Sequence, residues 1–126
     1  MPDTPFAYCV LRVVPDVERA EFINAGVVLF ARQAGFLAAQ VALDRARLAA
    51  LAPGCDFEPV ARHLEALERV AAGDPDGGPI AAMEPSERFN WLAAPSSTVV
   101  QASPVHTGVT GDPAAKLAQL FARFVA

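Results

Sequence analysis

The sequence predicts an α+β fold in which an antiparallel sheet of about four strands is covered by helices on one face. Strand-like runs fill the first third of the chain, and the links between them are too short for parallel crossovers. Two later segments carry apolar residues at helical spacing. The chain has 126 residues, so we expect residues 1–126 to form a single domain.

The first part of the chain predicts an antiparallel meander. The first run is apolar on both faces except at Arg12, which is typical of a strand covered on both sides. Gly26 indicates a bulge or a close backbone approach in the second run. Gly35 ends a hairpin-type turn before the third. We predict these strands over residues 6–14, 21–31 and 36–43.

Two helices are expected to follow the strands. Asp44 is a suitable N-cap for a short helix that ends near Leu51. Asp56 caps a longer helix, and Gly73 is a natural stop for it. One apolar stripe on the longer helix is made by Phe57, Val60, Leu64, Leu67 and Ala71.

The last third alternates loops with short elements. Residues 73–79, with the sequence GDPDGGP, are expected to form a flexible loop. A helical turn is predicted within 85–92 and a strand over 98–103. Asp112 followed by Pro113 begins the final helix, because proline fits the first helical turn.

Composition narrows the function classes. Hydrophobic residues make up 53% of the chain, enough for a real core. The net charge is −4 and the arginines are scattered, which disfavours nucleic-acid binding. The apolar runs are too short to cross a membrane, and no basic leader is visible, so we expect a cytoplasmic protein.

Metal, cofactor and catalytic motifs are missing from the sequence. Cys9 and Cys55 are expected to be free thiols, and two histidines without a CxxC pair give no zinc-site spacing. No nucleophile elbow, phosphate-binding loop, dinucleotide fingerprint or HExxH motif is present. We therefore expect no cofactor or metal, and we disfavour independent catalysis.

One segment is too unusual for a generic connection. Residues 88–112 read RFNWLAAPSSTVVQASPVHTGVTGD and contain the only tryptophan, one of two histidines and many hydroxyl groups. Together with residues near the first two strands, this segment supplies the candidate binding residues. They are Arg12, Glu21, Asn24, Arg88, Trp91, Ser97, Thr98, Gln101, Ser103, His106 and Thr107.

The chain resembles the bacterial family known as domain of unknown function 3037. The resemblance rests on YCVLRVVPD at 8–16, RAEFINAGV at 19–27, RFNWL at 88–92, SSTVVQ at 96–101 and SPVHTG at 103–108. It implies no established activity. It does imply a small stand-alone protein that is often encoded beside a HipA-like kinase, and hence a protein partner.

Each candidate near the first strands has a structural and a functional interpretation. Arg12 either forms a buried pair with Glu21 or Glu18, or binds an anion with support from Glu21. Asn24 either satisfies the backbone at a bulge or faces a ligand.

The candidates from 88 onward are equally open. Arg88 either stacks on Trp91 or joins it as an anchor for a partner. Ser97 and Thr98 suit a turn and strand start, while Gln101 and Ser103 share a strand face. A phosphate or nucleotide pocket would combine Ser97, Thr98, His106 and Thr107 with Arg12 or Arg88.

Our leading hypothesis is a small adaptor or accessory subunit that binds a protein through residues 88–108, with a HipA-like kinase as the partner. The alternative is a small phosphate- or nucleotide-ligand binder, or an enzyme, that uses a pocket of hydroxyl, histidine and arginine side chains. A third interpretation is a homodimer formed along exposed strand edges.

Overall fold

The computed structural model describes residues 3–126, which form five strands, four α-helices and three short 3-10 turns. The strands are β1 (Thr4–Val13), β2 (Ile23–Ala31), β3 (Phe36–Val41), β4 (Val100–Ala102) and β5 (His106–Thr110). The helices are α1 (Arg45–Leu51), α2 (Phe57–Ala72), α3 (Pro85–Ala93) and α4 (Pro113–Phe124). The 3-10 turns are Arg32–Ala34, Pro75–Gly77 and Ile80–Ala82.

The strands form one antiparallel sheet in which β1 is central. β2 pairs with one edge of β1, and β3 pairs with the outer edge of β2. On the other edge of β1, β4 pairs with Leu11–Val13 and β5 pairs with Thr4–Tyr8. β4 and β5 therefore lie end to end along the same strand. The α+β class and the antiparallel sheet are confirmed, with five strands instead of about four.

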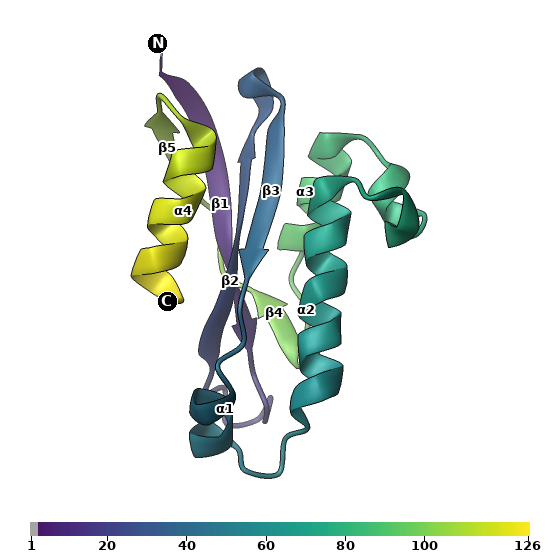
Figure 1. Cartoon of the computed structure of the whole chain (residues 1–126), viewed down its shortest axis with the longest axis vertical. Helices are drawn as coiled ribbons and strands as arrows, with labels where there is room; N and C mark the ends of the chain where they lie inside the picture. The colour runs from purple at the N-terminus through teal and green to yellow at the C-terminus, as the bar shows by residue number, and fades with distance from the viewer. Residues whose placement is uncertain (1–2) are drawn as a thin grey trace.

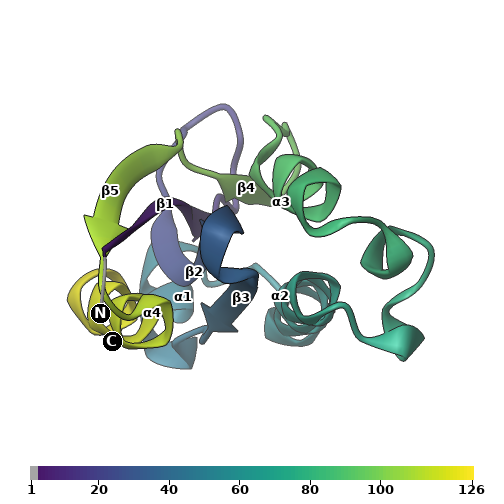
Figure 2. The same cartoon turned by 90° about the horizontal axis from the view of Figure 1, so that it is seen from above.

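The helices cover both faces of the sheet, so the expectation that they pack on one face is wrong. Figure 1 shows α4 on one side of the sheet and α2 and α3 on the other, and the view in Figure 2 agrees. The reason is the alternation of side chains along β2. Val28 packs into the core with α2 and α3, whereas Val27 and Leu29 pack with Leu117 and Leu120 of α4.

A bulge in β2 explains Gly26. Leu11 pairs with Gly26 and Arg12 pairs with Asn24, so Ala25 is one extra residue on the bulged strand. A Cβ atom on Gly26 would lie 2.9 Å from Val41 Cγ1 and 3.1 Å from the carbonyl oxygen of Gln40. Both the bulge and the close backbone approach predicted at this glycine are confirmed.

Helix starts and stops follow the predicted caps closely. The Asp44 carboxylate accepts a hydrogen bond from the Arg47 N–H at 2.9 Å, and that of Asp112 accepts from the Ala115 N–H at 3.1 Å. Gly73 ends α2 in the left-handed conformation at φ 67°. Asp56 precedes α2 without a side-chain capping bond.

The segment after α2 is more structured than the sequence suggested. Residues 75–77 form a 3-10 turn within the predicted loop, and the Asp74 carboxylate accepts from the Asp76 N–H at 2.8 Å. The helical turn predicted within 85–92 is a nine-residue helix. β5 was not predicted. No helix among residues 3–126 is long and apolar enough to cross a bilayer.

Candidate functional site

Arg12 lies on β1 between Asn24 of β2 and Gln101 of β4, which are its partners in the two strand pairs. Directly paired residues point to the same face, so the three side chains form one polar row across the sheet. The guanidinium lies 4.2 Å above the Phe22 ring, within cation–π distance. Its Nε is buried and has no hydrogen-bond partner among the described residues.

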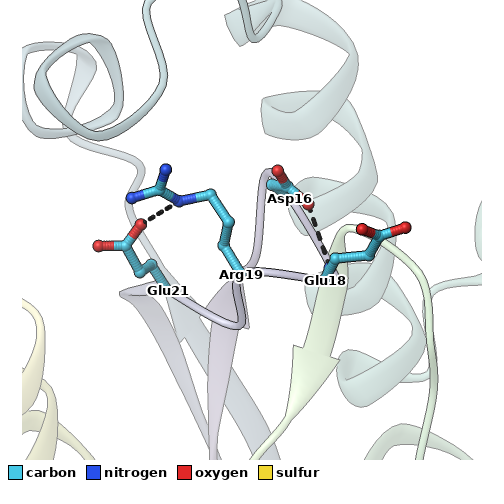
Figure 3. Close-up of polar contacts among 4 residues, drawn as sticks. All are labelled: Asp16, Glu18, Arg19 and Glu21. Atoms are coloured by element: carbon cyan, nitrogen blue, oxygen red, sulfur yellow. Dashed lines mark hydrogen bonds and ion pairs between the residues drawn. The ribbon is translucent and has the colours of Figure 1, made fainter.

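The predicted ion pair between Arg12 and Glu21 is not formed. Glu21 accepts a hydrogen bond from Nε of Arg19 at 2.6 Å, on the exposed connection between β1 and β2 (Figure 3). Glu18 is also on this connection, where its backbone N–H donates to Asp16 at 3.1 Å. The Phe22 ring, which was not among the predicted site residues, lies against the guanidinium instead.

The side-chain amides of Asn24 and Gln101 both donate hydrogen bonds to backbone carbonyls. The Asn24 amide donates to the Phe124 carbonyl at 3.1 Å, and so satisfies an orphan acceptor at the end of α4. The Gln101 amide donates to the Thr98 carbonyl at 2.9 Å. Asn24 therefore has the backbone-satisfying contact that was one of its two interpretations, but the carbonyl belongs to a helix end and not to the bulge.

Arg88 is also occupied inside the fold. Its guanidinium donates to the carbonyl oxygens of Met83 at 3.0 Å and of Ala71 at 3.5 Å. Nη1 lies 3.1 Å from the position that a Cβ on Gly73 would occupy, so the glycine leaves room for the guanidinium. These contacts tie α3 to the C-terminal end of α2. Among the described residues, no cation–π contact joins Arg88 to Trp91.

Trp91 stands at a cavity of about 330 Å³ between α2, α3 and β4. The indole is 45% exposed, although its neighbours Phe89 and Leu92 are buried and hold α3 in place. The cavity walls are largely aliphatic, and four polar residues also line it. Those four are His63, Ser96, Thr98 and Gln101.

This cavity was only partly predictable. Trp91, Thr98 and Gln101 were candidates, whereas His63, which is exposed and also lines the cavity, was not. The aliphatic walls include Leu11 and Leu67, which the sequence marks only as core positions. The apolar patterns that place these two leucines in the core do not show that they also border a cavity.

The hydroxyl groups around β4 have separate structural roles. Thr98 donates to the Val100 carbonyl at 2.9 Å and also contacts the Ser96 hydroxyl at 2.8 Å. Ser103 is buried and bonds to Val10 and Pro104. Ser97 is exposed.

His106 and Thr107 lie on β5, far from Ser97 and Thr98. The His106 ring is 5.4 Å from the Tyr8 ring, and Thr107 pairs with Ala7. The N–H of Val14, by contrast, bonds to Val99 at the start of β4. Ala7 and Val14 are seven residues apart in extended chain, which is roughly 23 Å. The proposed hydroxyl–histidine pocket is therefore not assembled.

A second, shallower hollow of about 550 Å³ was not anticipated. It lies beside β5 and is lined by Pro5, Phe6, Ala7, Phe30, Arg32, Thr107, Gly108 and Val109. Val109 is 63% exposed, the highest value among the large hydrophobic residues that the structure describes as exposed. The missed strand β5 is the reason that this surface was not foreseen.

The thiols and acidic groups do not form a metal site. Cys9 is buried and Cys55 half-buried, and both are free. Burial raises the pKa of the Cys9 thiol to about 11, which keeps it protonated at neutral pH. Within residues 3–126, no group of three or more His, Cys, Asp or Glu side chains is arranged to hold a metal ion.

Comparison with known proteins gives one match, and it covers nearly the whole chain. Searches of curated proteins and of solved structures found no match. The model of a family described as "Protein of unknown function (DUF3037)" matches residues 8–125. That span includes β1 from Tyr8 onward, the Trp91 cavity and all of α4. The chain therefore belongs to the DUF3037 family of proteins of unknown function.

Proposed function

We propose that this chain is a small accessory subunit that binds a protein partner through Trp91 and the adjoining cavity. The observation that carries the proposal is a half-exposed indole that lines a largely apolar cavity of about 330 Å³. Tryptophan is enriched among the residues that dominate binding energy at protein interfaces. Covering this exposed indole with a partner would remove a large apolar surface from water, which favours binding.

The setting of Trp91 favours a preformed contact. α3 is fixed below it by Phe89, whose ring lies 5.3 Å from that of Phe30 in the sheet. Arg88 fixes the same helix to the end of α2 through the Met83 and Ala71 carbonyls. A rigid helix loses little freedom on binding, so more of the contact energy remains for affinity.

The cavity suits the side chains of a protein segment. Aliphatic walls would accept an apolar side chain, and the exposed His63 at the same cavity would meet the backbone or a polar side chain of the partner. As the partner we propose a HipA-like kinase, on the family resemblance, with both proteins in the cytoplasm.

Co-expression tests this proposal. The tagged chain should co-purify with a HipA-like kinase from its host when the two are co-expressed. Trp91→Ala should weaken the complex at least 10-fold, by the usual size of an interface hot spot. Val17→Ala is the matched control, because Val17 is 46% exposed and lies in the connection between β1 and β2. A complex that tolerates Trp91→Ala, or no complex at micromolar concentration, contradicts the proposal.

The alternative, a phosphate or nucleotide binder or an enzyme, draws most of its support from Arg12, because the Arg88 guanidinium, although its Nε is likewise buried and without a partner among the described residues, already donates to the Met83 and Ala71 carbonyls. The Arg12 guanidinium has a buried Nε without a hydrogen-bond partner among the described residues. Ser97, Thr98, His106 and Thr107 lie too far apart to complete the pocket with it. Calorimetric titration with nucleotides and phosphorylated peptides tests this alternative, and heat that disappears in Arg12→Met would favour it.

A further inference from the structure

We propose that β5 is a dimerisation edge, at which two copies of this chain pair antiparallel about a two-fold axis through Thr107. This inference is independent of the Trp91 cavity. It rests on whether side chains bond to the backbone groups that the outer strands of the sheet leave unpaired. An edge strand exposes a row of N–H and C=O groups that can template another strand unless they are blocked.

Two of the three outer strands are blocked by side chains. On β3, the Val41 N–H donates to the Glu68 carboxylate at 3.3 Å, so a charge from α2 lies across that edge. On β4, the Thr98 hydroxyl donates to the Val100 carbonyl at 2.9 Å. Both contacts occupy backbone groups that a further strand would need.

β5 has no such protection. Its sequence, HTGVT, has no charged residue and no proline, which are the usual devices that keep edge strands apart. No side chain of the described residues bonds to the backbone of Thr107 or Val109. In Figure 2, β5 lies at the outside of the molecule with no helix or strand beyond it.

The register on β1 defines which groups point outward. Val109 pairs with Pro5, which has no N–H, so this pair does not exchange hydrogen bonds. Antiparallel pairs alternate along a ladder, so the Thr107–Ala7 pair is also of the non-bonded kind. The N–H and C=O groups of Thr107 and Val109 therefore point away from β1, toward the free edge.

The strand is its own complement at this edge. Pairing Thr107 with the Thr107 of a second copy places Val109 opposite the other copy's Val105. These valines are 63% and 45% exposed, and the pairing would cover both. Cross-strand threonine pairs and β-branched apolar pairs stabilise sheets. A closed two-fold dimer needs such a self-complementary patch, which is why we infer a second copy and not a foreign strand.

Sedimentation tests the association. Between about 1 µM and about 500 µM, the mass should rise from 13.3 kDa toward twice that value, since a short edge gives a weak dimer. Val109→Lys adds a charge to the edge and should keep the chain monomeric. Val17→Lys is the control at another exposed valine and should leave the dimer intact.

Cross-linking tests the register. Directly opposite residues in a bonded antiparallel pair have Cα atoms about 5.5 Å apart, which suits a disulfide. In a Cys55→Ser background, Thr107→Cys should therefore form a disulfide-linked dimer at least 10-fold faster than Val109→Cys. A monomeric wild type at the highest concentration, a dimer that tolerates Val109→Lys, or equal cross-linking at both positions would each overturn the proposal.

Discussion

The hydroxyl of Ser103 accepts a hydrogen bond from the Val10 backbone N–H at 2.8 Å and donates one to the Pro104 carbonyl at 2.9 Å. The Ser103 N–H in turn donates to the Val10 carbonyl at 2.8 Å. Val10 therefore keeps both backbone bonds at the point where β4 ends and β5 has not begun. A buried side chain bridges the break in the strand that flanks β1.

Ser103→Ala should lower the free energy of unfolding by about 1–3 kcal/mol, because it leaves the buried Val10 N–H without a partner. Chemical denaturation measures this change. The exposed Ser97→Ala is the control and should change stability by less than about 0.5 kcal/mol. Equal effects at the two serines would show that the bridge does not stabilise the sheet.

Gly26→Ala should destabilise the fold by about 1–3 kcal/mol, because the added methyl group meets backbone and packed side-chain atoms. One of its neighbours is the carbonyl oxygen of Gln40, at 3.1 Å, which cannot rotate away. Gly54→Ala is a suitable comparison, since a Cβ there meets nothing within 4 Å. Thermal unfolding of the two variants should separate them by several degrees.

Arg88→Met should loosen the segment that joins α2 to α3, because it removes the bonds to Met83 and Ala71. We expect a loss of about 1–3 kcal/mol in unfolding free energy and faster amide exchange over residues 73–84. The Trp91 substitution, by contrast, should weaken the partner complex while leaving that exchange unchanged. If Arg88→Met abolishes binding without altering exchange, the side chain is a partner contact.

The two thiols should differ sharply in reactivity. Cys55 is half-buried and should react with a thiol reagent in the folded protein, whereas Cys9 should react only on unfolding. Mass spectrometry after a short pulse of iodoacetamide would show which cysteine is modified. Early modification of Cys9 would contradict the packing of β1 against α2 and α3.

The same burial predicts a dependence of stability on pH. The pKa of Cys9 rises from an ordinary value of 9.0 to about 11 in the folded chain. Above pH 9.0 the unfolded chain loses this proton while the folded chain keeps it, so the Cys9 contribution to stability is complete below that pH and declines as pH rises toward about 11. The denaturation midpoint should therefore decrease between about pH 8 and about pH 10.5 in the wild type, and this decrease should be smaller in Cys9→Val.

The candidate site shows where the sequence was informative and where it was not. Trp91, Thr98 and Gln101 were singled out as unusual, and all three line one cavity. Arg88 was grouped with Trp91 because they are three positions apart on a helix, yet its guanidinium donates to the carbonyls of Met83, just before that helix, and of Ala71, near the end of α2. Sequence spacing gives the face of a helix, but long side chains reach whichever acceptor the neighbouring element supplies.

The sequence by itself determined the local elements of this protein. Apolar runs, capping aspartates at 44 and 112, and glycines at 26 and 73 act within a few residues, so they mark strands, helix starts, the bulge and the helix stop directly. Only the tertiary structure decided that α4 crosses to the opposite face and that β5 occupies the free edge of β1. Those features depend on contacts between distant segments, and a short polar strand without apolar alternation becomes visible only when its hydrogen-bonding partner is in place.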